Sequence, residues 1–365
     1  MKNNFIFLFF IFLYIINFIN QLKANNSVII VLALNNFYVP YVSVMIESII
    51  QNAKQKRKYE IYILTTNISL KNKENLKNQI KKDKRFFIEF INVTNFIENK
   101  NLNTFAHLTI ETYFRFLIFD LFPFYKKILY LDSDLIINAD ISELYDLNIE
   151  GKYLAAAKDI DTAGSLNFQE GKKKYINEII GCKGDDEYFQ AGVILFNILE
   201  IKKKVSSEIL FYIAQGRKWE WMDQDILNFV FKGKIFYLNQ RWNCIMNWVG
   251  LIENKTRIDI LKLAPESLFN EYLEARKNPL IIHYAGNQKP WEIPFCDFSN
   301  YFWKYANKSI YINQIIIQNK KKRKRKKIQK LLFKYIKIKF IYPFFFIKLI
   351  LLFYHYFINI NLYIK

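Results

Sequence analysis

The segment KILYLDSDLIINAD, residues 127–140, decides both the fold and the site. Residues 128–131 are continuously apolar, which is typical of a strand covered on both faces in a parallel sheet. Burying a charge is costly, so Asp132 and Asp134 are expected at the mouth of this strand. In open α/β sheets, ligands bind outside the carboxyl ends of the strands, where these acids would emerge. Two carboxylates on one short turn suit Mg²⁺ or Mn²⁺ shared with a diphosphate. A solvated turn at the end of a strand is the simpler alternative.

Strand-like and helix-like segments alternate from residue 28 onward. Apolar, β-branched runs predict strands at residues 28–34, 59–65 and 86–91. Pro40 is placed to open a helix that ends near Asn52, and Ser69 to cap a polar helix that ends near residue 82. This rhythm predicts an α/β fold with a doubly wound, mostly parallel sheet. Right-handed crossovers would gather the strand ends at one edge, so the turn after the first strand and the two acids should face the same crevice.

The composition indicates one large domain with appendages. The chain has 365 residues, of which 52% are apolar, and it can bury a full core. Its net charge is +20, but residues 320–339 hold twelve basic residues and no acid, which leaves about +8 for the rest. Three widely spaced cysteines, Cys182, Cys244 and Cys296, fit neither a disulfide framework nor a zinc site, and we expect them to be reduced thiols in the core.

The two ends of the chain differ from its body. Residues 5–19 form an apolar run that is short for a spanning helix, so a cleaved signal and an uncleaved anchor or peripheral helix both stay open. The basic run at residues 320–339 precedes an apolar segment, which predicts attachment to an anionic membrane surface. A nucleic-acid patch or a solvated linker are the alternatives; no nucleic-acid module accompanies the run, so no nucleic acid is expected. The domains expected are therefore 1–24 (hydrophobic), 25–305 (catalytic) and 306–365 (membrane-associating).

Two features lie on either side of the central segment. Arg115, in a helix expected to start at Thr109, sits among apolar neighbours where a guanidinium needs a partner. A structural salt bridge is the default for it, and a fork onto an acid or phosphate at the crevice is the alternative. Residues 161–186 are polar and Lys-rich and contain Gly, so we expect a long loop that lies over the crevice as a lid or an acceptor-facing loop.

Three later stretches carry polar groups next to apolar runs. Gln190, Ala191 and Gly192 open a predicted strand, where small residues let a ligand approach the backbone. Asp223, Gln224 and Asp225 begin a predicted helix; capping explains either acid but not Gln224. His283 ends an apolar strand and is followed across a Gly turn by Lys289. A lone His of this kind is more often structural, but two carboxylates await a third ligand, and imidazole favours Mn²⁺ over Mg²⁺. Lys289 can neutralise a phosphate.

Six stretches, in this order, resemble the successive motifs of glycosyltransferase family 8. They are residues 30–49 (IVLALNNFYVPYVSVMIESI), 107–116 (HLTIETYFRF), 128–137 (ILYLDSDLII), 188–197 (YFQAGVILFN), 223–228 (DQDILN) and 281–291 (IIHYAGNQKPW). The resemblance implies a retaining, metal-dependent sugar transferase with a GT-A fold, similar to bacterial lipopolysaccharide glucosyl- and galactosyltransferases. It covers roughly residues 28–291 and leaves the tail outside.

The resemblance implies a role for each matching position. Asp132, Asp134 and His283 match the metal ligands, with Mn²⁺ or Mg²⁺ as the cofactor. Asp223 and Gln224 match the pair beside the anomeric carbon and are the candidate catalytic residues. The positions that match contacts to the UDP-sugar donor are Ala33, Asn35, Phe37, Arg115, Ser133, Gln190, Ala191, Gly286 and Lys289.

Three departures from the family pattern concern the donor. Asn35 replaces a usual Asp that reads uracil, Phe37 replaces a polar residue, and Gln190 replaces a usual Asn, so the donor sugar, glucose or galactose, stays open. The acceptor expected is a glycan or lipid-linked glycan such as lipopolysaccharide. A self-glycosylating or hydrolytic enzyme of the same fold, or a membrane-associated protein with an inactive site, are the alternatives. The location expected is the cytoplasmic face of the inner membrane in a bacterium, or a lumenal membrane in a eukaryote.

Overall fold

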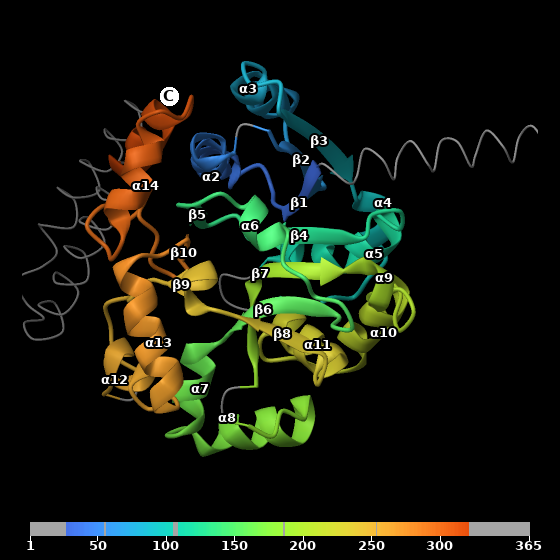
Figure 1. The fold of residues 1–365 in the computed structure, drawn as a ribbon, viewed down its shortest axis with the longest axis vertical. Helices are drawn as coiled ribbons and strands as arrows, with labels where there is room; N and C mark the ends of the chain where they lie inside the picture. Colours follow the sequence, from blue (N-terminus) through green and yellow to red (C-terminus); the bar gives the residue numbers. More distant parts are fainter. Residues whose placement is uncertain (1–26, 55, 105–108, 185–186, 253, 321–365) are drawn as a thin grey trace, which may run out of the picture. The chain divides into compact units, whose positions relative to one another are not determined.

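A seven-stranded sheet forms the centre of the fold (Figure 1). The computed structural model describes residues 27–54, 56–104, 109–184, 187–252 and 254–320. The strand order is β3-β2-β1-β4-β7-β6-β8, and only β7 runs against its neighbours, antiparallel to β4 and β6. The predicted α/β fold with a mostly parallel sheet is confirmed. The strands are β1 (Ser27–Ala33), β2 (Lys58–Thr65), β3 (Phe86–Asn92), β4 (Lys127–Leu131), β6 (Leu154–Lys158), β7 (Phe189–Asn197) and β8 (Ile235–Leu238).

The central strands are apolar because both faces of the sheet are covered. Every residue of β1 is buried, and so are Ile128 to Leu131 of β4. Such continuous burial is expected for parallel strands between helical layers and explains why these runs do not alternate with polar residues. The three N-terminal strands and β4 begin and end within one or two residues of the predicted bounds.

A second sheet of three short strands lies beside the first. Its order is β5-β10-β9, with β5 (Leu135–Ile137) antiparallel to β10 (Ile281–His283), and β10 parallel to β9 (Cys244–Ile245). Figure 1 shows these strands between the main sheet and the helices α13 (Glu266–Lys277) and α14 (Ser299–Ala306). Because β5 starts shortly after β4 ends, residues 132–134 form the junction between the two sheets.

Asparagine side chains hold both ends of β7. At its start, Asn228 accepts a hydrogen bond from the N–H of Phe189 (2.8 Å) and donates one to its carbonyl oxygen (2.9 Å). At its end, the Asn197 side chain donates to the carbonyl oxygens of Ile149 (3.2 Å) and Lys152 (3.0 Å). Both Asn side chains are buried, so their hydrogen bonds are not exchanged for water.

The helices before β4 follow the predicted starts. α2 (Val39–Asn52) has Pro40 in its first turn, and Ser69 caps α3 (Leu70–Ile80) through the N–H of Asn72. The expected helix after Thr109 is a 3₁₀ helix, η1 (Ile110–Leu117). The other helices of the first half are α4 (Thr94–Ile97), α5 (Ile118–Leu121) and α6 (Ser142–Tyr145).

The expectation of a long loop at residues 161–186 is wrong. The described part is largely helical, with α7 (Ile160–Leu166), α8 (Glu170–Lys174) and a π-helix, η2 (Tyr175–Ile180). The reason is that Asp159 caps α7 through the N–H of Thr162, and that Ile160, Ala163 and Leu166 recur at helical spacing and are buried. The remaining helices are α9 (Ile198–Ile201), α10 (Ser207–Gly216), α11 (Met222–Phe231), η3 (Gln240–Asn243) and α12 (Arg257–Leu261).

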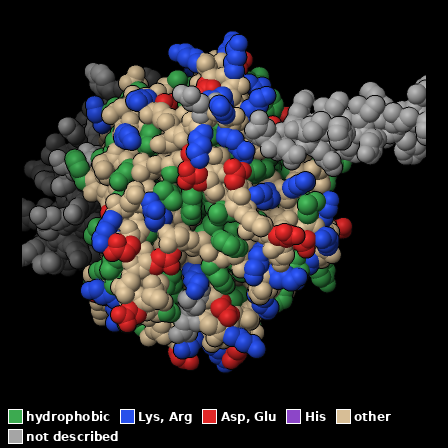
Figure 2. Space-filling model, viewed as in Figure 1, with side chains coloured by type: hydrophobic (Ala, Val, Ile, Leu, Met, Phe, Trp, Pro, Cys, Tyr) green, Lys and Arg blue, Asp and Glu red, His purple; other side chains and the backbone are tan. Residues whose placement is uncertain are grey.

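The compact body extends to Ile315. After α14, the Ser309 hydroxyl is 2.8 Å from that of Ser43 in α2, and the Tyr311 hydroxyl contacts Asn72 and Asn75 in α3. All three cysteines are free and buried, as predicted. On the face shown in Figure 2, basic and acidic side chains are interspersed rather than gathered into one basic patch.

The predictions for the two ends of the chain fall on residues outside the described part. These are the apolar run at residues 5–19, the basic run beyond Lys320 and the apolar segment that follows it. Within the described residues, no helix combines the length and the apolar character that crossing a membrane requires.

Candidate metal and ligand site

The junction between the two sheets brings three distant stretches together. The N–H of Asp132 donates to the carbonyl oxygen of Gly192 in β7 (2.8 Å), and the N–H of Tyr284 donates to the carbonyl oxygen of Asp134 (3.1 Å). His283 pairs with Leu135 across β10 and β5. The register of two strand pairs therefore brings the two aspartates and His283 together.

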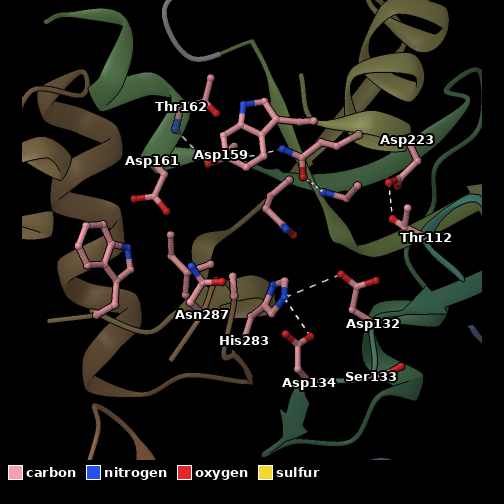
Figure 3. A pocket seen from close by; sticks show the side chains of 18 of the residues that line it. Thr112, Asp132, Ser133, Asp134, Asp159, Asp161, Thr162, Asp223, His283 and Asn287 are labelled. Carbon is pink, nitrogen blue, oxygen red and sulfur yellow. Dashed lines mark hydrogen bonds and ion pairs between the residues drawn. The ribbon is translucent and has the colours of Figure 1, made fainter. Parts of the chain in front are cut away.

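Asp132, Asp134 and His283 form a group that could hold a metal ion. One ligand atom from each lies within 4.8 Å of the others. The His283 Nε2 atom is 3.3 Å from Asp134 Oδ1 and 3.9 Å from Asp132 Oδ2 (Figure 3). Two carboxylate oxygens and one imidazole nitrogen are a donor set that suits a divalent cation such as Mn²⁺. The side chains present thus fit a metal.

Each of the two carboxylates also has a basic partner. Arg115 Nη2 lies 2.9 Å from Asp132 Oδ1, and the Lys289 ammonium group contacts Asp134. Burial raises the pKa of the Asp134 carboxyl, but Lys289 and His283 outweigh it and hold this pKa well below the usual range. Asp134 is therefore ionised at neutral pH and ready to bind a cation.

Arg115 lies at the centre of a buried network. Its side chain is 4% exposed, and its Nε atom is 3.0 Å from Asp223 Oδ2. It also donates to the carbonyl oxygens of Thr112 and Ala191, and its guanidinium lies over the Tyr130 ring. Arg115 thus forms the expected salt bridges, with Asp132 and Asp223. It also lines the crevice, where the alternative placed it.

Gly192 leaves space for the metal group. A Cβ atom added to it would lie 2.3 Å from His283 Cε1 and 2.8 Å from Asp132 Oδ2. Both distances are far shorter than carbon–carbon or carbon–oxygen contacts, so no other residue fits here without displacing a ligand. The small residue expected at the start of this strand is required by His283 and Asp132.

The start of α11 supplies two more candidates. The Thr112 hydroxyl donates to Asp223 Oδ1, while Asp223 Oδ2 accepts no hydrogen bond from the described residues. Gln224 Oε1 accepts from the N–H of Ala191 (2.9 Å), and Gln224 Nε2 donates to Asp159 (3.0 Å). Gln224 therefore ties α11 to β7 and to the residue that caps α7. Asp225 has a structural role, because it accepts from the N–H of Trp221 and from two tyrosine hydroxyls.

One cavity of about 760 Å³ connects these groups, which is a volume that fits a small-molecule site. All the predicted site residues line it except Phe37, which is 58% exposed. The turn after β1 and the aspartates share this crevice as predicted, with the Ser133 hydroxyl donating to the carbonyl oxygen of Ala33 (3.0 Å). The residues expected as a lid contribute Asp161, Thr162, Ser165, Gln169 and Lys172.

The sequence reasoning missed Asn243 and Asp159. Asn243 contacts both His283 Nδ1 (2.9 Å) and Gln190 Oε1 (2.6 Å), and Asp159 anchors Gln224. Asn is so common in this chain that a single Asn carried no signal. Asp159 directly follows the apolar strand β6, and that position at a strand end could have indicated it.

Comparison with known proteins gives the family. The family model described as Glycosyl transferase family 8 matches residues 29–293. General stress protein A of Bacillus subtilis (strain 168) is 28% identical over 263 residues, 70% of this chain and 84% of that protein. A lipopolysaccharide 1,2-glucosyltransferase of Escherichia coli (strain K12) is 28% identical over 185 residues, 49% of this chain and 48% of that protein.

Two solved structures share the fold. The bifunctional glycosyltransferase WbbM superposes with a TM-score of 0.71 and 29% identity, over 80% of this chain and 51% of that one. The galactosyltransferase LgtC, solved with donor and acceptor sugar analogs, gives a TM-score of 0.60 and 25% identity, over 77% of this chain and 96% of that one. The chain thus spans about half the length of WbbM and of the E. coli enzyme. Because the family model covers more than half of the chain, this protein is a glycosyltransferase that belongs to glycosyltransferase family 8.

Proposed function

We propose that this glycosyltransferase moves a hexose, glucose or galactose, from a UDP-sugar to a glycan or lipid-linked glycan, with Mn²⁺ or Mg²⁺ as cofactor and retention of anomeric configuration. The observation that carries this proposal is the convergence of Asp132, Asp134 and His283 at one end of a cavity that Lys289 also lines. The named activities of similar proteins, a lipopolysaccharide glucosyltransferase and a galactosyltransferase, support the choice of sugar and acceptor.

The proposed roles follow from charge and position. Asp132, Asp134 and His283 hold the cation, which when bound neutralises charge on the diphosphate of the departing UDP. Lys289 adds a second positive charge toward the phosphates. Gly286, two residues after Tyr284, has a backbone φ of 89° and allows the turn that returns Lys289 to Asp134.

The donor contacts proposed lie around the same cavity. Ala33, Asn35 and Ser133 are placed for the nucleotide, and Gln190 and Ala191 for the sugar. Asn35 Oδ1 accepts a hydrogen bond from the N–H of Phe37 (3.0 Å). The NH₂ group of Asn35 is therefore the part proposed to bond the edge of the base. Phe37 itself is exposed outside the cavity lining, which weakens its proposed role as a donor contact.

The reaction breaks the bond between the anomeric carbon and the diphosphate oxygen, and the electron pair leaves with UDP. The acceptor hydroxyl oxygen forms the new bond to the anomeric carbon, and its proton passes to the diphosphate of the departing UDP. Asp223 and Gln224 orient the sugar. The Asp223 Oδ2 atom forms an ion pair with Arg115 Nε (3.0 Å) but accepts no hydrogen bond among the described residues, so it is suited to receive one from a sugar hydroxyl. Gln224 is a poor nucleophile, so we propose attack from the face of the leaving group.

The test measures UDP release from UDP-glucose and UDP-galactose with Mn²⁺ or with a chelator, in the presence and absence of a glycan acceptor. We expect release that needs both metal and acceptor, and its loss in Asp134→Asn. The matched control is Asp146→Asn, since Asp146 is 56% exposed and pairs only with Arg57 among the described residues. Failure of the folded wild type to bind a UDP-sugar with Mn²⁺ would contradict the proposal.

The same assay separates the alternatives. Metal-dependent UDP release into water, or sugar found on the protein itself by mass spectrometry, would indicate a hydrolytic or self-glycosylating enzyme. No binding and no release would indicate an inactive site.

We also propose that the basic run at residues 320–339 and the following apolar segment attach the enzyme to an anionic membrane, at the cytoplasmic face in a bacterium or at a lumenal face in a eukaryote. The support is the charge pattern alone, since each basic residue near such a surface contributes about 1 kcal/mol. Flotation with vesicles of anionic or of zwitterionic lipid tests it. Both proteins compared lack the apolar run at residues 5–19. We expect residues 25–365 to float with anionic vesicles only, and residues 25–319 to float with neither kind of vesicle.

A further inference from the structure

Three polar side chains form a continuous hydrogen-bonded chain behind the metal group. Asn243 at the end of η3 is 2% exposed; its Oδ1 atom is 2.9 Å from His283 Nδ1 and its Nδ2 atom is 2.6 Å from Gln190 Oε1. Gln190 Oε1 also accepts from the backbone N–H of Gly192 (2.6 Å). The chain thus runs from β7 through η3 to β10.

A backbone donor sets the direction of every hydrogen bond in this chain. The N–H of Gly192 can only donate, so the Gln190 atom that faces it must be the oxygen. Asn243 must then present its NH₂ group to that oxygen and its own oxygen to His283. It follows that His283 carries a hydrogen on Nδ1. When the ring is neutral, the lone pair of Nε2 then faces Asp134 (3.3 Å) and Asp132 (3.9 Å).

The Gln190 end of this hydrogen-bonded chain faces the ligand cavity. Gln190 lines the cavity, and its oxygen is already used by two donors. None of the described residues accepts a hydrogen bond from Gln190 Nε2. The amide therefore offers the cavity donors only, which suits an oxygen of the bound sugar.

We propose that Asn243 is the positioning residue of this site: it accepts from His283 and donates to Gln190, and so holds a metal-facing nitrogen and a ligand-facing amide in their working orientations. The proposal rests on the proposed function for the identity of metal and sugar. Residues that orient a metal-bound His commonly change metal affinity or activity by about 10- to 100-fold when replaced.

Three variants separate the two contacts of Asn243. Asn243→Leu keeps the side-chain size and removes both hydrogen bonds. Asn243→Asp still accepts from His283, but its oxygen faces the Gln190 oxygen, so only the second contact is lost. Gln190→Glu keeps both acceptor roles of residue 190 and removes the donor offered to the sugar.

The first readout is the imidazole tautomer of His283 in the metal-free full-length protein, measured by ¹H–¹⁵N correlation of ring nitrogens at a pH where the ring is neutral. The chain has 3 histidines, so comparison with His283→Gln assigns the signal. We expect the Nδ1–H tautomer in wild type, Asn243→Asp and Gln190→Glu. In Asn243→Leu we expect a shift toward Nε2–H, which can donate to Asp134.

The second readout is Mn²⁺ affinity together with kcat/KM for the UDP-sugar. We expect Asn243→Leu to bind Mn²⁺ about 10- to 100-fold more weakly. Asn243→Asp and Gln190→Glu should keep Mn²⁺ affinity within about threefold and lose about tenfold in kcat/KM, as for one lost hydrogen bond. Asn148→Leu, at an Asn outside the cavity lining, is the control for an Asn-to-Leu change.

An Nε2–H tautomer in wild type, or an unchanged tautomer in a folded Asn243→Leu, would overturn the proposal. The tautomer is measured without metal, donor or acceptor. If the wild type shows the expected tautomer and its loss in Asn243→Leu but binds no Mn²⁺, the proposed function fails while the positioning role of Asn243 stands.

Discussion

The backbone N–H of Asp132 donates a 2.8 Å hydrogen bond to the carbonyl oxygen of Gly192, and this bond joins the end of β4 to the start of β7. The backbone of residue 192 can approach Asp132 this closely because the residue is a glycine. The side chains of His283 and Asp132 occupy the space that a Cβ atom would need. The two residues are far apart in the sequence, and the antiparallel pairing of β4 with β7 makes them neighbours.

Gly192→Ala should abolish metal binding in a protein that still folds. The added methyl group would lie 2.3 Å from His283 Cε1, and overpacking of this kind costs about 1–3 kcal/mol of unfolding free energy. Calorimetric titration with Mn²⁺ and thermal unfolding measure the two effects. Gly171→Ala is the matched control, because a Cβ there meets nothing within 4 Å in α8. Equal Mn²⁺ affinity in the two variants would show that the close approach is unimportant.

Arg115→Ala should lower the unfolding free energy by about 3–5 kcal/mol, since removing one partner leaves the buried Asp223 carboxylate uncompensated. The Arg115 side chain is 4% exposed and pairs with Asp132 and Asp223. Denaturant unfolding measures the loss. Lys277→Ala removes an exposed ion pair with Glu274 and should change little. A loss in Arg115→Ala no larger than in Lys277→Ala would contradict a structural role for Arg115.

Gln224→Glu should impair the enzyme, and Asp159→Asn should restore it in the double variant. Gln224 Nε2 donates to Asp159 Oδ2, so a carboxylate at position 224 would face a carboxylate. Burial, followed by the nearby Asp161, already raises the pKa of Asp159. An Asn at position 159 can still cap α7 and can donate to the carboxylate introduced at position 224. A double-mutant cycle on kcat and unfolding free energy measures the coupling; simple addition of the two single effects would refute this contact.

The contribution of Asp223 to stability should fall as pH rises. Burial raises its pKa from 3.8 to about 6, although Arg115 and Thr112 oppose the rise and Asp132 adds to it. The folded state then holds this proton more tightly than the unfolded state, so the stabilisation is complete below pH 3.8 and is lost through pH 6.

Asp223→Asn removes the titrating group and serves as the reference. Between about pH 4 and pH 7, the unfolding free energy of the metal-free wild type should fall by about 2–3 kcal/mol relative to Asp223→Asn. The hydroxyl groups of Tyr113 and Tyr130 interact electrostatically with Asp223. Burial raises their pKa values, so both hydroxyls stay neutral over this pH range. A constant difference between the two proteins would contradict the raised pKa.

Local pattern explains why some of this architecture could be predicted. The apolar runs of β1 and β4 require burial on both faces, and Pro40 and Ser69 mark helix starts, so the sheet edge with Asp132 and Asp134 followed from sequence. The helices at residues 160–180 were missed because Gly and Lys suggested a loop, whereas Asp159 caps α7 and buried residues at helical spacing stabilise it.

The position of His283 depends on a contact that no local pattern contains. It reaches the aspartates because β10 pairs with β5 in the second sheet, and that pairing depends on the whole chain. The family resemblance supplied His283 as a candidate, but Asn243, which orients it, lies among many Asn residues and could be identified only from its contacts.

The asparagine contacts at both ends of β7 have a consequence for ligand binding. Successive side chains of a strand point to opposite faces, so slippage by a single position would turn Gln190 away from the cavity and move Gly192 from beneath His283. Asn228 and Asn197 oppose such slippage before any substrate arrives. We therefore expect that the free energy of ligand binding is not consumed in ordering this strand.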